Sequence, residues 1–392
     1  MPVLISFLLG LPRAGLQSEL LAFFDHALGR EDCVSKSALC QARSQLDPGA
    51  LRGLLHAHDA LAGEHFALPQ SMRWHGLRVL ALDSTVLRVP DVPECADFFG
   101  GMKTSCGRFR PLARASALWD VARGCFVDAT VGGYRRDDRS LAMAHLPHLS
   151  SSDLLVMDRG YPSRQWLGTL QQAQVPFCVR MCDLNWTLVR NFARSGQDDA
   201  IAVDKGAKGQ PELRLRLIRH CLPSGRMLLL ATNVFDASIG PAQFAQLYRQ
   251  RWQIEEAFKQ VKARMQVENF SGVLPHVVQQ DLYAALLRSN CAAWLMLAER
   301  LQAEQQGRTE TVSQTNYGTW QHKHNRCVVG KMLGHHLAGV LLALGDWQQR
   351  LLRLWQRLRL SLAKVVTKVG RTNPRAPRKV RIAEFHPAYK GA

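Results

Sequence analysis

Three acidic residues stand where the chain could hold divalent metal ions. Asp83 follows the apolar run at residues 77–82, which only Arg78 interrupts, and Asp158 follows the apolar run at residues 154–157. Runs of this length predict buried strands. A carboxylate after each strand would place two acids along one edge of an α/β sheet, where sites commonly lie. Glu255, on a later helical segment, is the third candidate.

The segment at residues 241–265 has helical periodicity, and its polar side chains share one face. At 100° per residue, four of them fall within an arc of about 60°: Tyr248, Arg251, Glu255 and Lys262. An apolar stripe lies beside this arc and could pack on the sheet. Glu256 projects well away from the arc, so Glu255 is the better candidate of the adjacent pair.

This combination favours phosphodiester chemistry. Two Mg²⁺ ions held by a few carboxylates can activate a nucleophilic oxygen, neutralise charge at phosphorus and stabilise the leaving oxygen. Arg251 and Lys262 could hold a phosphate near the metals, and Tyr248 could hydrogen-bond the DNA backbone or stack on a base. Taken singly, a Glu and a Lys on a helix indicate a solvated face, and a strand-end Asp indicates a turn or cap. It is the constellation that predicts catalysis.

Three motifs resemble those of the DDE transposases of the insertion-sequence-four family. They are Leu82-Asp83-Ser84-Thr85, Met157-Asp158-Arg159-Gly160-Tyr161, and Tyr248-x2-Arg251-x3-Glu255-x6-Lys262. The last is the most specific. The resemblance extends over roughly residues 15–300, and it implies an RNase H-like catalytic core with an inserted antiparallel β subdomain. Strand-like patterns between residues 176 and 234 independently predict such an insertion.

The resemblance also implies residue roles. Asp83, Asp158 and Glu255 would bind two Mg²⁺ ions, for which Mn²⁺ could substitute. The transposon-end DNA would contact Tyr248, Arg251 and Lys262. In relatives a Trp of the insertion stacks on a flipped base, and Trp186 is the candidate, with a place in the core as the alternative. Two further acids, Asp137 and Asp138, either support the metal ligands or form a solvated cluster with neighbouring arginines.

The function that follows is cut-and-paste DNA transposition. The enzyme would bind terminal inverted repeats and hydrolyse the transposon end. The freed 3′-hydroxyl would form a hairpin-ended intermediate, and the end would then be inserted into target DNA. Pairing of two ends implies a homodimer on double-stranded DNA. Two alternatives remain: an RNase H-like nuclease that only hydrolyses, and a DNA-binding relative without activity.

Charge supports a polyanionic partner. The 392 residues carry a formal net charge of +18, with a pI of about 9.9. Such an excess favours nucleic-acid binding, although a merely basic soluble protein is the alternative. Ten cysteines lack metal-site spacing. We expect no signal peptide and no membrane span, and hence a soluble cytoplasmic protein associated with the nucleoid.

Six regions are predicted along the chain. The N-terminal helical region at residues 1–75 is either a DNA-binding unit or a packing cap, and it carries no excess of positive charge. The others are the first part of the RNase H-like core (76–175), the β insertion (176–235), the catalytic helix completing the core (236–275), a C-terminal helical region (276–365) and a basic tail (366–392).

Overall fold

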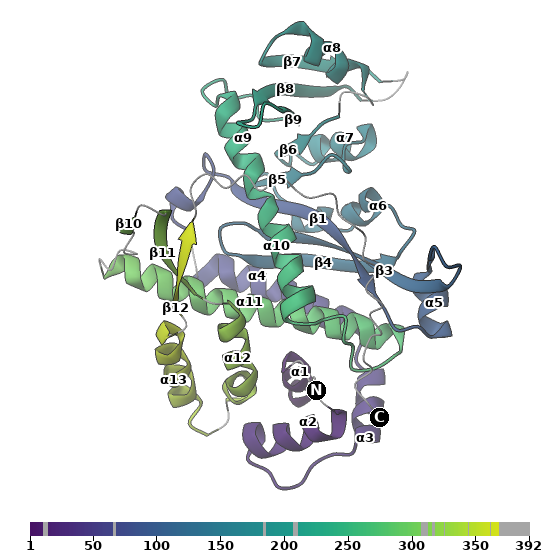
Figure 1. The fold of residues 1–392 in the computed structure, drawn as a ribbon, viewed down its shortest axis with the longest axis vertical. Coiled ribbons are helices and arrows are strands. Elements are labelled where there is room, and N and C mark those ends of the chain that lie inside the picture. Colours follow the sequence, from purple (N-terminus) through teal and green to yellow (C-terminus); the bar gives the residue numbers. More distant parts are fainter. Residues whose placement is uncertain are drawn as a thin grey trace. The chain divides into compact units, whose positions relative to one another are not determined.

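The computed structural model is a mixed α/β protein whose chain divides into two compact units (Figure 1). One unit combines Met1–Leu51 with Val261–Ala392, and the other is Arg52–Gln260. The structure describes residues 1–10, 15–65, 68–182, 186–206, 211–306, 313–315, 318–324, 326–343, 345–360 and 362–367. These units cut across the six predicted regions, because residues 52–75 belong with the sheet and residues 261–275 do not.

A large sheet forms the centre of the unit Arg52–Gln260. Its order in the described residues is β2-β3-β1-β5-β6-β9-β8-β7, with β4 paired to β3. Strands β1, β5 and β6 run parallel to one another, and the other pairs are antiparallel. The strands are β1 (Arg78–Arg88), β2 (Gly101–Lys103), β3 (Phe109–Asp120), β4 (Cys125–Gly133), β5 (Asp153–Met157), β6 (Phe177–Arg180), β7 (Asp199–Asp204), β8 (Leu213–Cys221) and β9 (Met227–Thr232).

Strand β1 is longer than the sequence predicts. The apolar run ends at Leu82, but β1 continues to Arg88, so Asp83 lies within the strand and not at its end. The reason is the antiparallel partner β3, which pairs with β1 from Leu80 as far as Arg88. The parallel partner β5 ends earlier, since its last residue, Met157, pairs with Leu82. Asp83 is therefore the first residue of β1 beyond the parallel pairing.

Helices cover both faces of this sheet. Val79 and Val156 point to one face, where they pack against α9 (Pro241–Gln250). Leu80 and Leu155 point to the other, against α6 (Asp138–Met143), α7 (Arg164–Gln172) and α8 (Thr187–Ser195). Because strand side chains alternate, Asp83 belongs to the face covered by α9. In Figure 1, α9 and the following α10 (Trp252–Lys259) run across the strands.

The predicted β insertion is present as antiparallel strands, but they form no sheet of their own. Strand β9 pairs with β6, so β7, β8 and β9 continue the central sheet. Both faces of β8 and β9 contribute to the same two apolar clusters as the parallel strands. The same unit holds α5 (Pro93–Phe99), the 3₁₀ turns η2 (Gln70–Met72) and η3 (Leu146–His148), and most of α4 (Pro48–His65).

The other unit is mainly helical. Its elements are α1 (Pro2–Leu9), α2 (Leu16–Ala22), the π-helical η1 (Phe23–Leu28), α3 (Lys36–Ser44), most of the π-helical η4 (Gln260–Arg264), α11 (Pro275–Gln305), α12 (Arg326–Leu341), α13 (Trp347–Leu360), β10 (Ser313–Thr315), β11 (Gly318–His324) and β12 (Leu362–Thr367). Gly29 ends the predicted N-terminal helix with a left-handed φ of 62°, and Ser35 caps α3 by accepting from the Ala38 N–H. The helix predicted at residues 330–360 is two helices, with Gly345 at a φ of 52° between them. The small sheet β10-β11-β12 was not predicted.

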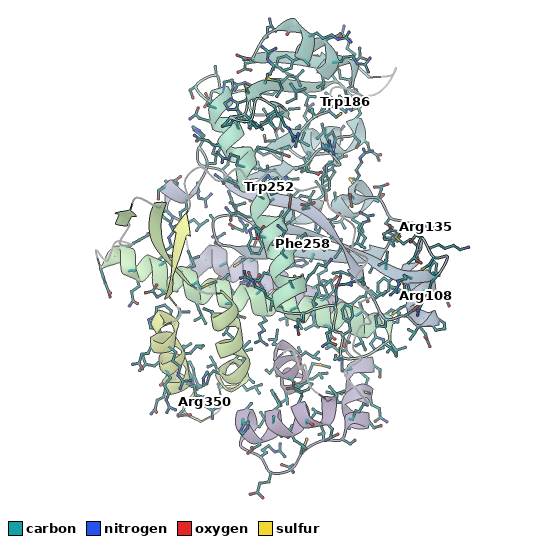
Figure 2. The ribbon with its side chains drawn as sticks, viewed as in Figure 1. Arg108, Arg135, Trp186, Trp252, Phe258 and Arg350 are labelled. Carbon is teal, nitrogen blue, oxygen red and sulfur yellow. The ribbon has the colours of Figure 1, made fainter. Side chains whose placement is uncertain are left out.

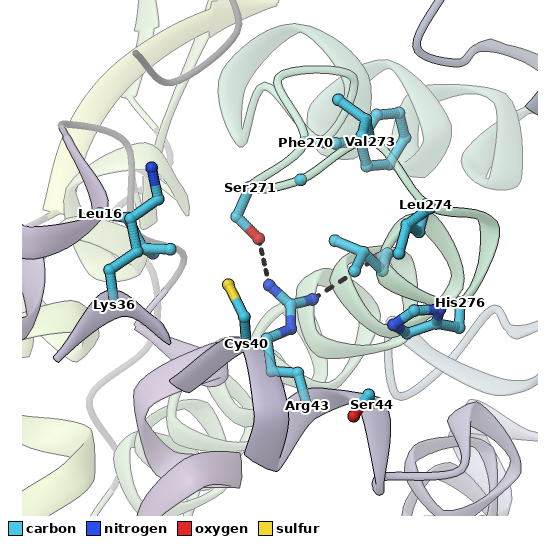
Figure 3. Close-up of a pocket in the computed structure, with 12 residues that line it drawn as sticks. Leu16, Lys36, Cys40, Arg43, Ser44, Phe270, Ser271, Val273, Leu274 and His276 are labelled. Atoms are coloured by element: carbon cyan, nitrogen blue, oxygen red, sulfur yellow. Dashed lines mark hydrogen bonds between the residues drawn. The ribbon is translucent and has the colours of Figure 1, made fainter. Parts of the chain in front are cut away.

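Arg43 ties α3 to α11 within this unit. Its buried guanidinium donates to the Gln280 and Asp281 side chains at 2.9 Å each, and also to Ser271. Figure 3 shows it beside a cavity of about 390 Å³ between α3 and the segment before α11. Because the guanidinium is already paired inside the unit, Arg43 serves packing here. No described helix is both long enough and apolar enough to cross a membrane.

Candidate active site

Asp83 and Asp158 lie next to each other at the end of the parallel pairing. Each directly follows a residue of the last β1–β5 pair, Leu82 and Met157. The carboxylate of Asp83 accepts the backbone N–H of Ser84 at 2.8 Å. The carboxylate of Asp158 accepts the N–H of Gly160 at 2.7 Å, and a Cβ at that glycine would come within 3.1 Å of the same oxygen. The glycine thus lets the chain turn closely around Asp158.

The third carboxylate arrives on the helix. Helices α9 and α10 meet at Arg251, whose backbone stays helical, and Glu255 follows in the first turn of α10. Arg251 Nη1 donates to Asp83 Oδ2 at 2.9 Å, and its Nη2 donates to Glu255 Oε1 at 2.7 Å. The guanidinium is 7% exposed and links two of the three predicted metal ligands. Glu256 is exposed and pairs with Lys259 at 2.5 Å, which agrees with the helical phase.

Burial makes the Asp83 charge costly. Burial raises the pKa of Asp83 to about 6, and the nearby charges of Asp158 and Glu255 raise it further, whereas Arg251 and the Ser84 N–H oppose them. Like charges at one site each disfavour ionisation of the others. The cluster therefore requires positive charge, and in this structure the Arg251 guanidinium supplies it.

The donor set suits a hard divalent cation. Carboxylate oxygens are the ligands Mg²⁺ prefers, and the ion keeps several waters, so three acids suffice. A guanidinium bridging Asp83 and Glu255 occupies the position that a cation shared by these two side chains would take. The residues present therefore fit the metal ions that the sequence motifs imply.

Tyr248 is buried beside the same cluster. Its side chain belongs to the apolar contact between α9 and the sheet and is 5% exposed. The Arg251 guanidinium carbon lies 5.8 Å from the centre of its ring. Burial raises the pKa of Tyr248, which Arg251 and Arg180 oppose and Asp158 reinforces. The tyrosine therefore stands between the carboxylates and positive charge, with little of its ring open to a base.

Lys262 lies elsewhere than the regular-helix construction suggests. The α-helix ends at Lys259 and a π turn, Gln260–Arg264, follows, so 100° per residue does not apply as far as Lys262. Its Nζ lies 3.3 Å from a carboxylate oxygen of Glu268. Lys262 also belongs to the helical unit, whereas Asp83, Asp158 and Glu255 all lie in Arg52–Gln260.

Trp186 precedes α8 among the outer strands. It is partly buried and packs against the apolar cluster on the α7 face of the sheet. Figure 2 shows it in a different part of the unit from Trp252, which begins α10 and is 43% exposed. The packing alternative for Trp186 is therefore consistent with its surroundings.

The structure adds polar residues that the sequence did not single out. Ser84 donates to Asp138 at 2.6 Å, and Arg114 donates to the same oxygen at 2.7 Å. Asp138 thus orients the residue next to Asp83, while Asp137 caps α6 by accepting from Ser140 N–H. Arg180 at the end of β6 follows an apolar run just as Asp158 does, a signal that could have identified it.

A second polar cluster surrounds Asp128, a fully buried residue of β4. Its carboxylate accepts two bonds from Arg52 at 2.8 Å, one from His56 at 2.7 Å and one from His145 at 2.7 Å. His148 lies 3.9 Å away, and the His56, Asp128 and His148 ligand atoms are close enough to consider a metal. The carboxylate already has as many donors as its two oxygens accommodate, so we interpret the cluster as a structural link between α4 and β4.

The geometry can now be compared with known proteins. The family model of the transposase DDE domain matches residues 74–291, which is more than half of the chain. The chain belongs to the transposase DDE domain family. The match includes Asp83, Asp158 and Glu255.

Individual relatives carry the same family name. Transposase InsG for insertion sequence element IS4, from Escherichia coli (strain K12), is 26% identical over 287 residues, covering 69% of this chain and 63% of InsG. Putative transposase InsZ, from the same strain, is 27% identical over 157 residues, covering 40% of this chain and 50% of InsZ. The resemblance to DDE transposases of the insertion-sequence-four type is thus confirmed.

The matched regions span only part of these relatives, 63% of InsG and 50% of InsZ. Among solved structures, a cryo-EM structure of the piggyBac transposase synaptic complex with hairpin DNA matches with a TM-score of 0.45 and 11% identity. That match covers 92% of this chain and 76% of the piggyBac chain.

Proposed function

We propose that this DDE family member is the transposase of a bacterial-type insertion sequence, cutting and joining DNA with divalent cations held by Asp83, Asp158 and Glu255. The observation that carries the proposal is the Arg251 bridge, which draws Glu255 to Asp83 beside Asp158. Carboxylates gathered around a buried cation are the arrangement that a metal site needs.

Two Mg²⁺ ions, for which Mn²⁺ could substitute, would activate the attacking oxygen and neutralise charge at phosphorus. The protein's own residues would supply position. Asp83 and Asp158 stand on neighbouring strands, and Glu255 is carried by a helix packed on the same face. Such rigid elements hold catalytic groups more accurately than loops do.

The DNA contacts follow from charge and position. Once a cation occupies the carboxylates, the Arg251 guanidinium can turn to a phosphate of the transposon end, which its planar fork suits. Tyr248 would support this side chain, Lys262 would hold a second phosphate, and Trp186 would stack on a flipped base. The partners would be double-stranded transposon ends and target DNA, bound by a homodimer in the nucleoid of the cytoplasm.

The reaction would follow a cut-and-paste route after binding of the terminal inverted repeats. Hydrolysis would release a 3′-hydroxyl at the transposon end, and this hydroxyl would attack the opposite strand to close a hairpin. Opening of the hairpin by hydrolysis and attack on target DNA would complete the transfer. We assign this chemistry to an RNase H-like core at residues 76–175 and 236–275, with residues 176–235 as its β insertion. Residues 1–75, 276–365 and 366–392 would be flanking regions.

The experiment that tests this function is a cleavage assay with the full chain. Purified protein is incubated with Mg²⁺ and a linear duplex carrying the inverted repeats that flank its gene, and products are resolved on a denaturing gel. Changing Asp83 or Asp158 to Asn, or Glu255 to Gln, should abolish cleavage. End binding should persist, because phosphate contacts come from Lys and Arg.

The matched control is Glu256→Gln, which removes an exposed carboxylate one residue away and should leave cleavage intact. A wild-type cleavage rate for Glu255→Gln would remove Glu255 from the metal site. Hydrolysis without strand transfer from pre-cut ends would instead select a nuclease.

A further inference from the structure

Tyr161 is a buried tyrosine that the assignments above leave without a function. It lies in the turn after β5, where its N–H bonds to the carbonyl of Asp158 at 3.3 Å. The side chain is 1% exposed and belongs to the apolar cluster that contains Leu82 and Met157. These two residues directly precede Asp83 and Asp158, so the ring packs beneath the start of the carboxylate site.

The hydroxyl of Tyr161 has no hydrogen-bond partner among the described residues. Burying a hydroxyl without a partner costs free energy, and almost all buried polar groups avoid it. A phenylalanine would fill the same space without this cost. Packing therefore accounts for the ring at position 161 but not for its oxygen.

Negative charge surrounds that oxygen. Burial raises the pKa of Tyr161 well above its ordinary value, and the charges of Asp83, Asp138 and Asp158 raise it further, while Ser84 opposes them. The hydroxyl thus keeps its proton and can act only as a neutral donor near three carboxylates. Ser84 directs its own proton to Asp138 at 2.6 Å.

We propose that Tyr161 is a positioning residue of the cation site, whose hydroxyl donates to an oxygen bound to a divalent cation held by Asp83 and Asp158. The oxygen belongs either to a carboxylate or to a water on the cation, and both accept the same bond. The proposal rests on the proposed function. Its physical basis is that a donor without a partner in the metal-free protein gains one when the site is loaded.

The test compares Tyr161→Phe with the wild-type chain in thermal unfolding, first in EDTA and then across a Mg²⁺ titration. In EDTA the variant should melt at or above the wild-type temperature, because no hydrogen bond is lost and an unpartnered hydroxyl is removed. The Mg²⁺ concentration for half-maximal stabilisation should rise about three- to tenfold, the contribution of one hydrogen bond. Cleavage at subsaturating Mg²⁺ should slow, and DNA binding in EDTA should not change.

A purely structural tyrosine predicts the reverse. The variant would then melt lower in EDTA and keep the wild-type Mg²⁺ dependence, and this result would overturn the proposal. Tyr134→Phe is the matched control, because its hydroxyl lies 3.5 Å from the Met102 sulfur outside the carboxylate site. It should leave the Mg²⁺ dependence unchanged.

Asp83→Asn separates this inference from the proposed function. If Asp83→Asn loses Mg²⁺ stabilisation while Tyr161→Phe keeps the wild-type dependence, the cation site stands and only the inference about Tyr161 fails. If Asp83→Asn responds to Mg²⁺ like the wild type, the cation is bound elsewhere and the proposed function fails with it.

Discussion

Replacing Arg251 with Gln tests whether the guanidinium competes with the metal ions. Arg251 makes two hydrogen bonds to carboxylates, at 2.9 Å to Asp83 and 2.7 Å to Glu255. Bonds to charged groups contribute about 1.5–3 kcal/mol each. The carboxylates are 18% and 30% exposed, so solvent screens part of this energy. We expect the variant to lose about 2–4 kcal/mol of unfolding free energy in EDTA.

Mg²⁺ should restore much of that loss. In the wild type a cation must displace the guanidinium from Asp83 and Glu255, whereas in the variant these carboxylates are unpaired and repel each other. Relief of only about 1.4 kcal/mol would tighten the apparent Kd for Mg²⁺ tenfold. Urea unfolding in EDTA and in saturating Mg²⁺ gives the stabilities, and a Mg²⁺ titration gives the affinity.

The cleavage rate should move in the opposite direction. Arg251→Gln should bind Mg²⁺ more tightly yet cleave poorly, because the phosphate loses its bidentate donor. Arg251→Lys keeps the charge but lacks the planar fork, so it should also lose most cleavage. Arg249→Gln, which changes an exposed arginine of α9, is the control. Equal destabilisation of Arg251→Gln in EDTA and in Mg²⁺ would refute competition between the guanidinium and the cation.

Three further outcomes follow from the charges described above. The pKa of Asp83 is raised from 3.8 to about 6, so its contribution to stability is present below pH 3.8 and is lost as pH rises through 6. In EDTA, the stability of the wild type relative to Asp83→Asn should therefore fall by up to about 3 kcal/mol between pH 4 and 7, and a flat difference would contradict the shift. Asp128→Asn should cost about 3–5 kcal/mol without altering the Mg²⁺ dependence, as urea unfolding and a Mg²⁺ titration can check; an altered dependence would mean that this cluster binds the cation. Removing residues 368–392, which spares β12, should reduce the salt slope of DNA binding by about 0.9 per lost phosphate contact, and an unchanged slope would mean that the tail makes no such contacts.

Much of the site was predictable because it depends on local pattern. Short apolar runs followed by acids predicted that Asp83 and Asp158 lie at neighbouring strands, and the structure brings them together. Helical phase favoured Glu255 over Glu256, and only Glu255 bonds to Arg251. The phase argument stopped holding at Gln260, where the helix becomes π-helical. Single-turn changes of helix type leave little trace in the apolar periodicity that sequence analysis uses.

The sequence by itself determined the family and the acids, since strand periodicity, helix phase and motif spacing are written in neighbouring residues. Only the tertiary structure decided how the site is held. Strand β1 continues past Asp83 because β3 pairs with it, and β7, β8 and β9 join the central sheet because β9 meets β6. Arg251 bridges Asp83 across 168 residues, and the hydroxyl of Tyr161 is buried without a partner. Such features arise from pairings between distant segments and from burial, which the whole fold selects and no local pattern specifies.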